Sequence, residues 1–365
     1  ASGDYDDPIL NGQPHWTKPP LTYVAIMGGI RAFGLSPWGA RAYLVPALVL
    51  SALAVWLAGT FIWGRITGFW AGLVFATSPF VVGAANVVSS DVLTTLWVAL
   101  AFAAFWHGHA RHSPLSILAM WVFLGLGFLT KGPPALLIPA ACLPLAGIRL
   151  RREGNGRFTS WLAVVGFGLF LLVGVLWYLE EAKQTPGLLA YWFGHELVGR
   201  NLGGEFNRNP GILPVFYMYL PILLFGAGPW LPLVVFKGRP LRDWWTAPQD
   251  PSAVARAARG SLLAGAAISF AVFSLSRSKL PLYLLPIFVP LALVLGRMIA
   301  VLIAQGRMRE RAAMTLAGAM VVLIVAGKGI FAHGDNPKDM TSLATALAPE
   351  LAKAPDQPFF TATGH

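Results

Sequence analysis

Long runs without charge constrain this chain more than any other feature. Ten segments contain no Asp, Glu, Lys or Arg, and each is close to the roughly 20 apolar residues that cross a bilayer as a helix. They are 42–64, 66–90, 92–110, 112–130, 132–148, 158–179, 209–236, 260–276, 280–296 and 312–327. Only 12% of all residues are charged, about half the share in soluble domains. The pattern predicts an all-α polytopic membrane protein, a transmembrane bundle of about ten spans.

The placement of Lys and Arg indicates the orientation of these spans. Every second loop is basic, and an excess of Lys and Arg is typical of cytoplasmic loops. The basic loops hold Arg65, Arg111, Arg149, Arg151, Arg152, Arg157, Lys237, Arg239, Arg242, Arg256, Arg259, Arg307, Arg309 and Arg311. An even number of spans then places both ends of the chain on the outer side. Most of the net charge of +11 therefore lies in the loops that set the orientation of the spans, and no nucleic-acid partner is expected.

Three parts are expected from this arrangement. Residues 1–35 form an outer juxtamembrane segment, and 36–332 form the transmembrane domain with one long outer loop at 180–212. Residues 333–365 begin a further outer domain. The chain does not begin with Met, and no apolar run precedes Ala1–Tyr5, so either a signal segment was removed or the sequence is a fragment. We expect a fragment, truncated at both ends.

The remaining charged residues collect on the outer side, where the positive-inside rule does not require cations. Ionisable residues close to the membrane are costly, so a functional role is their default interpretation. They are Lys18, Asp91, Lys131, His195, Glu196, Glu205, Arg208, Arg277 and Lys279.

Lys18 lies in a segment stiffened by two prolines, His15-Trp16-Thr17-Lys18-Pro19-Pro20. The amphipathic run 21–33 follows it and is expected to lie along a membrane surface. A rigid Lys at this edge suits the phosphate of a lipid-borne substrate, and the neighbouring His15 is a candidate for the same substrate loop. The alternative is a snorkelling Lys with Trp16 and Tyr23 as interface anchors.

Asp91 and Lys131 each lie at a predicted helix end. Asp91 opens a helix after two serines, so it is a candidate to cap that helix. The same carboxylate is also a candidate to accept a proton or hold a sugar hydroxyl or amine, and the two roles are not exclusive. Lys131 precedes Pro133 and Pro134, which break the helix, and it either snorkels or binds phosphate.

The 180–212 loop holds further candidates. Arg208 precedes a span, and its planar fork matches phosphate oxygens. His195 beside Glu196 is only a weak metal signal, so these two residues and Glu205 are interpreted as loop residues that line the substrate path or lie on the surface.

The strongest local signal is Ser276-Arg277-Ser278-Lys279-Leu280-Pro281-Leu282-Tyr283. Lys279 and Tyr283 are four residues apart and share a face if a helix continues through Pro281. Arg277, Lys279 and the Tyr283 hydroxyl then converge on a phosphate. The alternative is an interfacial belt, which explains Tyr283 but not the paired cations.

Several common chemistries have no motif in this chain. It shows no metal-ligand spacing of His and Cys, no phosphate-cradling Gly-rich loop, no Ser nucleophile elbow and no dinucleotide fingerprint, so no cofactor is assigned. A divalent metal stays an open alternative that the sequence does not support. An enzyme built this way needs an activated substrate, such as a membrane-borne sugar phosphate. The rival interpretation is a transporter or flippase of a lipid-linked anion, which should show ionisable residues at midplane and internal repeats.

These residues resemble motifs of the GT-C membrane glycosyltransferases that use polyprenyl-phosphate sugars, namely the ArnT-like lipid A aminoarabinose transferases and the bacterial protein O-mannosyltransferases. The matching pieces are Ala1–Tyr5, Trp16-Thr17-Lys18-Pro19-Pro20-Leu21, Asp91, Leu129-Thr130-Lys131-Gly132, 208–217, Gly228-Pro229-Trp230 and Lys279-Leu280-Pro281-Leu282-Tyr283. The resemblance implies a polyprenyl-phosphate-linked sugar donor, a lipid A-like or protein acceptor, and a periplasmic active site in the bacterial inner membrane.

The resemblance also implies roles for individual residues. Lys18, Lys131, Arg208 and Tyr283 would surround the carrier-lipid phosphate, with Arg277 and Lys279 added by position. Asp91 would belong to the catalytic cavity. Two departures stand out. The family's leading acidic pair lies upstream of Ala1, and Thr17 stands where many members have Glu, so contacts made through those residues cannot be carried over.

Overall fold

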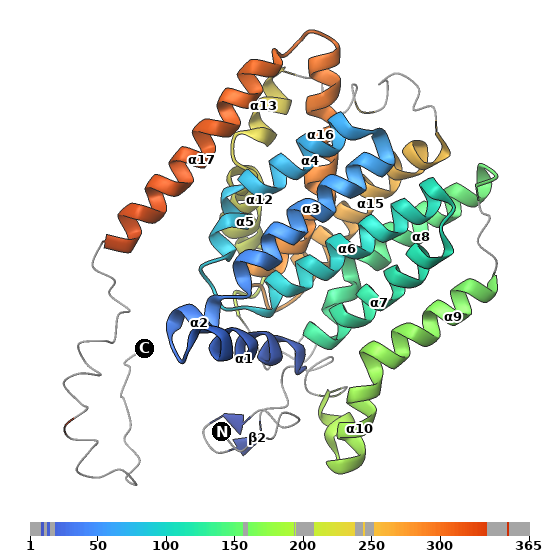
Figure 1. The fold of residues 1–365 in the computed structure, drawn as a ribbon, viewed down its shortest axis with the longest axis vertical. Helices are drawn as coiled ribbons and strands as arrows, with labels where there is room; N and C mark the ends of the chain where they lie inside the picture. The colour runs from blue at the N-terminus through green and yellow to red at the C-terminus, as the bar shows by residue number, and fades with distance from the viewer. Residues whose placement is uncertain are drawn as a thin grey trace. The chain divides into compact units, whose positions relative to one another are not determined.

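The computed structural model describes residues 9–10, 13–14, 19–155, 160–192, 194, 208–237, 244, 252–333 and 349. The chain divides into two compact units, Ala1–Met320 and Val321–His365. The first unit is a helical bundle (Figure 1). Its only described strands, β1 (Ile9–Leu10) and β2 (Gln13–Pro14), form a short antiparallel pair.

The N-terminal helix has the bounds of the predicted amphipathic run. α1 covers Leu21–Phe33 and is too short to span a bilayer, and α2 (Pro37–Arg41) follows it. A side chain at Gly29 would meet the backbone oxygen of Gly39 at 2.2 Å, so the two short helices touch backbone to backbone. α1 also contacts the helix 114–131 and runs across the ends of the long helices in Figure 1.

Eight helical stretches in the described residues are long and apolar enough to cross a membrane. They comprise α2 with α3 (Leu44–Trp63), α6 (Ser90–Arg111), α7 (Pro114–Lys131), η1 (Pro133–Leu136) with α8 (Leu137–Arg152), α9 (Ser160–Phe170) with η2 (Leu171–Val175) and α10 (Leu176–Gln184), α15 (Ala253–Leu275), η5 (Pro281–Ile287) with α16 (Phe288–Ala304), and α17 (Glu310–His333). The short α11 (Leu188–Ala190) follows α10.

Two of the ten charge-free runs are interrupted, which lowers the number of spans below the sequence expectation. The run 66–90 divides into α4 (Arg65–Thr77) and α5 (Pro79–Ala84), because Ser78 takes an extended backbone ahead of Pro79. The run 209–236 forms η4 (Val215–Tyr219), α12 (Leu220–Gly226) and α13 (Trp230–Lys237). A bend of 78° separates α12 from α13, so this pair is a ninth span only if it crosses as one.

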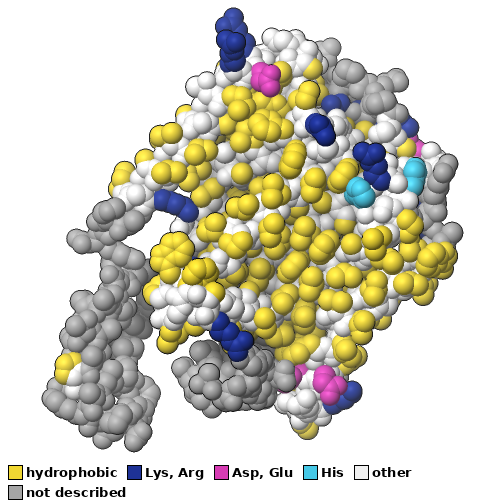
Figure 2. All heavy atoms as spheres, viewed as in Figure 1, with side chains coloured by type: hydrophobic (Ala, Val, Ile, Leu, Met, Phe, Trp, Pro, Cys, Tyr) yellow, Lys and Arg dark blue, Asp and Glu magenta, His cyan; other side chains and the backbone are white. Residues whose placement is uncertain are grey.

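The centre of the bundle is built around α6 and α16. In each, 78% of the most apolar window is buried, whereas only 22% is buried in the stretch containing α9. α3 packs on α4 and α6, α16 packs on α4, and α15 packs on α8. Figure 2 shows mainly hydrophobic side chains over α3, α6 and α7, with charged and His side chains gathered at the two ends of that face. This is the surface expected of a bundle surrounded by lipid.

Candidate active site

Asp91 lies in the first turn of α6 and is 6% exposed. Ser89 is the residue that caps this helix: its hydroxyl accepts a hydrogen bond from the Asp91 backbone N–H at 3.0 Å and donates to the Asp91 carboxylate at 2.7 Å. The capping role that the sequence suggested for Asp91 therefore belongs to Ser89. The second carboxylate oxygen, Oδ1, remains available for another partner.

That partner is Lys131, the last residue of α7. Its ammonium donates to Asp91 Oδ1, and the side chains of the pair are only 9% and 8% exposed. The two residues meet because α6 and α7 form an antiparallel pair, and because Gly132, with φ of +74°, ends α7 at this point. Lys131 is therefore engaged inside the protein and does not snorkel.

Tyr283 completes the cluster. The Lys131 Nζ lies 4.4 Å from the centroid of the Tyr283 ring, a cation–π distance. Tyr283 is half-buried in η5, which packs against α6. The cluster thus joins a carboxylate, an ammonium and a phenol from three elements that are distant in the sequence.

Lys279 occupies a different environment from the one expected. No helix continues through Pro281, because η5 begins there and Leu280 is extended, so Lys279 and Tyr283 do not share a helix face. The Lys279 side chain is buried, and its ammonium donates to the carbonyl oxygens of Gly211 at 2.7 Å and Ser276 at 2.6 Å. Burial lowers the pKa of this ammonium, because its charged form has lost water.

Hydrogen bonds of the main chain also join the segment around Lys279 to the segment that contains Gly211. The Lys279 N–H donates to the Arg208 carbonyl at 2.7 Å, and the Asn209 side-chain amide donates to the Lys279 carbonyl at 3.0 Å. Residues 208–211 and 276–279 are thereby joined into one unit, which we call the Lys279 clamp. The side chains of Arg208 and Arg277 are exposed on this clamp. The sequence predicts that Lys279 binds the donor phosphate together with Arg277 and Tyr283. In the structure its ammonium donates to two backbone carbonyls, so its role towards phosphate stays a prediction.

The remaining predicted residues lie outside the described part of the chain. These are Lys18, His15, His195, Glu196 and Glu205. Among the described residues, no group of three or more His, Cys, Asp or Glu side chains is placed to hold a metal ion.

Three residues near the cluster were not identified from the sequence. Ser89 orients Asp91, and the Tyr43 hydroxyl donates to the Ser89 carbonyl at 3.1 Å. Tyr219 is fully buried in η4, which contacts η5, the element that carries Tyr283. The Ser-Ser-Asp pattern contained a signal for Ser89, since Ser is a preferred N-cap, but no local pattern marks either tyrosine.

Comparison with known proteins gives a consistent result. Residues 17–178 match the family described as dolichyl-phosphate-mannose-protein mannosyltransferase. An undecaprenyl phosphate-alpha-4-amino-4-deoxy-L-arabinose arabinosyl transferase from Edwardsiella ictaluri is 34% identical over 302 residues, which are 81% of this chain and 52% of the relative. One from Pseudomonas savastanoi pv. phaseolicola is 31% identical over 338 residues, which are 89% of this chain and 60% of the relative. The chain spans about half the length of the curated relatives it matches.

A solved structure shares the fold. The crystal structure of ArnT from Cupriavidus metallidurans bound to undecaprenyl phosphate matches with a TM-score of 0.68 and 23% identity, over 99% of this chain and 59% of that one. The apo structure of the same protein gives the same TM-score. The resemblance seen in the sequence is therefore confirmed for the fold, and this multi-span membrane protein has the GT-C-type fold of the ArnT structure.

Proposed function

We propose that this chain carries the transfer site of an integral membrane glycosyltransferase. It moves a sugar from a polyprenyl phosphate to an acceptor that is a lipid A-like glycolipid or a protein. In this proposal the protein lies in the bacterial inner membrane, and its active site faces the periplasm. The observation that carries it is the buried pair of Asp91 and Lys131 beside Tyr283, at the end of the bundle opposite the Arg-rich loops.

The chemistry of sugar transfer suits these groups. When a sugar leaves its carrier, negative charge grows on the departing lipid phosphate, and cations placed there stabilise the transition state more than the ground state. Lys131 supplies a cation in a dry environment, where its charge acts strongly. The exposed Arg208 and Arg277 on the Lys279 clamp are placed to attract the phosphate from outside.

Asp91 has the complementary task. In the proposed reaction its carboxylate holds or deprotonates the acceptor hydroxyl or phosphate that attacks the sugar. Without substrate, Lys131 occupies one carboxylate oxygen and the Ser89 hydroxyl the other. An arriving phosphate competes with Asp91 for Lys131, so donor binding loosens the pair and makes the carboxylate available as a base. The Tyr283 ring holds the Lys131 ammonium in place while that ammonium exchanges Asp91 for the phosphate.

Similarity to relatives supports this assignment of substrate class. The curated relatives are named for undecaprenyl phosphate-linked aminoarabinose, and the structural neighbour was crystallised with undecaprenyl phosphate. We therefore propose an undecaprenyl-phosphate-linked pentose or hexose as the donor.

A transfer assay tests the proposal. The protein purified in detergent is given a panel of radiolabelled undecaprenyl-phosphate sugars with lipid A and protein acceptors, and wild type is compared with Asp91→Asn and Asp91→Glu. We expect transfer by wild type, a loss of about 100-fold or more in Asp91→Asn, and partial recovery in Asp91→Glu. Label that stays on the carrier with every acceptor, while the lipid crosses proteoliposome membranes, would establish a flippase instead.

A further inference from the structure

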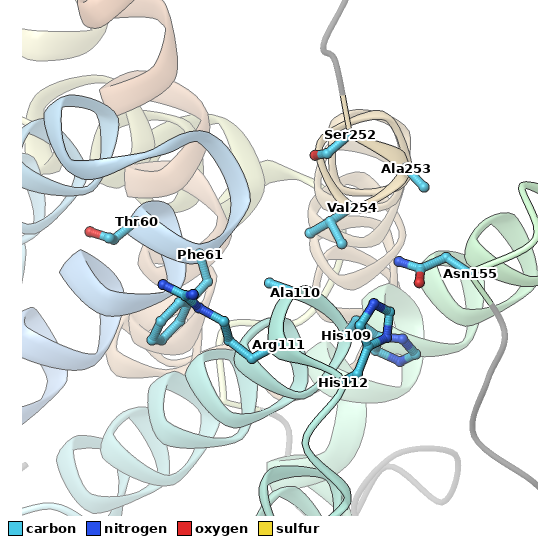
Figure 3. A pocket seen from close by; sticks show the side chains of 10 residues that line it. All are labelled: Thr60, Phe61, His109, Ala110, Arg111, His112, Asn155, Ser252, Ala253 and Val254. Carbon is cyan, nitrogen blue, oxygen red and sulfur yellow. The ribbon is translucent and has the colours of Figure 1, made fainter.

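A cavity lies at the other end of α6 from Asp91. It has a volume of about 430 Å³, within the roughly 300–1,000 Å³ typical of small-molecule sites. The last turn of α3, the C-terminal end of α6, Asn155 after α8 and the first residues of α15 line it (Figure 3). Because α6 has 22 residues, the cavity and Asp91 are about 30 Å apart. It is therefore separate from the candidate active site.

The titratable side chains among the described lining residues of this cavity are one arginine and two histidines. Arg111, His109 and His112 enter it from the end of α6, and no Asp or Glu is among its described lining residues. In Figure 3, Arg111 points towards α3, whereas the two histidines lie on the side of α8 and α15. The excess of Lys and Arg in cytoplasmic loops is enough to explain Arg111. It does not explain two histidines that line the same open cavity.

Backbone groups add to the same preference for an anion. The cavity includes Ala253 and Val254, the first residues of α15. Their N–H groups have no acceptor within the helix, and the Ser252 hydroxyl is already occupied by the N–H of Ala255. A helix N-terminus beside basic side chains favours a bound anion.

Two groups near the cavity in the described part of the chain that would oppose an anion are engaged elsewhere. The Gly108 carbonyl, near the C-terminal end of α6, accepts hydrogen bonds from the N–H groups of His112 and Ser113. Glu153, at the end of α8, is paired with Arg256 of α15 through a 2.7 Å hydrogen bond from Nε. Among the described residues that line the cavity, the one permanent charge is the positive guanidinium of Arg111.

We infer that this cavity is a binding site for a phosphate group, independent of the transfer reaction. Phosphate oxygens match the ring N–H groups of the histidines and the amide donors of α15 on one side of the cavity, and the Arg111 fork offers a cation on the α3 side (Figure 3). The cavity lies at the basic end of the bundle, next to the membrane edge. Its ligand is thus an anionic lipid head group or a small soluble phosphate ester, which offer the same chemistry.

Binding measurements with matched variants test this inference. Native mass spectrometry of the protein in detergent follows titration with phosphatidylglycerol, and calorimetry follows titration with glycerol 3-phosphate. The test variant combines Arg111→Gln with His112→Asn, since Asn tolerates the left-handed backbone at position 112, where φ is 52°. The control combines Arg65→Gln with Arg152→Gln, two exposed arginines at the same end that do not line the cavity.

We expect the test variant to bind at least one of the two probes about tenfold more weakly than wild type, and the control to bind it normally. A loss seen only with phosphatidylglycerol identifies a lipid head group, and a loss seen with glycerol 3-phosphate identifies a soluble ester. Equal binding of both probes by the test and control variants, or no binding by wild type, overturns the inference. If the test variant fails to fold, Ala253→Phe fills the cavity without changing charge and must weaken binding in the same way.

Discussion

Lys131, at the end of α7, forms an ion pair with Asp91, forty residues earlier in the first turn of α6. Both side chains are almost completely buried, so each charge depends on the other for compensation. The predictions below begin with this pair.

Breaking the pair from one side should cost more than removing it. Asp91→Asn or Lys131→Met leaves one buried charge alone, with an expected loss of about 3–5 kcal/mol in unfolding free energy. The double variant removes both charges and should be more stable than at least one single variant. Unfolding in mixed micelles gives the double-mutant cycle. Strictly additive losses would show that the two residues do not interact.

Tyr283 offers a way to separate packing from chemistry. Tyr283→Phe keeps the ring beside Lys131 and removes only the hydroxyl, so stability should stay within about 0.5 kcal/mol of wild type. Tyr283→Leu also removes the cation–π contact, which is worth about 0.5–2 kcal/mol. If the hydroxyl contacts the donor phosphate as proposed, Tyr283→Phe raises the KM for the donor while its unfolding curve overlays that of wild type. An unchanged KM would remove the hydroxyl from the site.

The Lys279 clamp predicts a dependence of stability on alkaline pH. A cation whose pKa is lowered in the folded protein lowers stability at pH values below that pKa. This cost disappears as the pH rises from the folded-state pKa to the ordinary lysine value. The stability difference between wild type and Lys279→Met should therefore shift in favour of wild type across that window. A difference that is constant with pH would mean that burial does not perturb this ammonium.

Close contact between α4 and α16 provides a test of the bundle itself. A side chain at Gly296 would lie 2.4 Å from the backbone nitrogen of Ala71, so Gly296→Ala forces the two helices apart. We expect a loss of about 1–3 kcal/mol in unfolding free energy. Gly147→Ala in α8 is the control, because a side chain there meets nothing within 4 Å and should be neutral or stabilising by up to about 1 kcal/mol.

The sequence predicted local features well where the physics is local. Two prolines and an amphipathic run were sufficient to place α1 at its observed bounds, 21–33. The described residues contain fewer candidate spans than the sequence has charge-free runs, and this difference has an equally local cause. Charge-free runs were found from the positions of charged residues alone, which do not reveal that Ser78-Pro79 and Gly228-Pro229 interrupt the helices within two of them. Gly228 takes a φ of +62° at the second break.

The candidate site was only partly accessible to the same reasoning. The distribution of Lys and Arg among the loops placed Asp91 and Lys131 on the same side of the membrane. Their pairing depends on how α6 packs against α7, and no repeating pattern in the sequence indicates that packing. The expected helix face shared by Lys279 and Tyr283 failed because η5 begins only at Pro281. Instead, tertiary contacts place Lys279 on the carbonyls of residues 211 and 276, and bring Tyr283 to Lys131.

Binding of the carrier lipid tests the central claim most directly. Affinity for undecaprenyl phosphate is measured by native mass spectrometry for wild type, Asp91→Asn, Lys131→Gln and the control Lys183→Gln, whose Lys is exposed and pairs with Glu180. Because phosphate and Asp91 compete for Lys131, we predict that Asp91→Asn binds at least as tightly as wild type but does not transfer sugar, whereas Lys131→Gln binds about tenfold more weakly. Equal affinities for Lys131→Gln and Lys183→Gln would contradict the assignment of Lys131 to the donor phosphate.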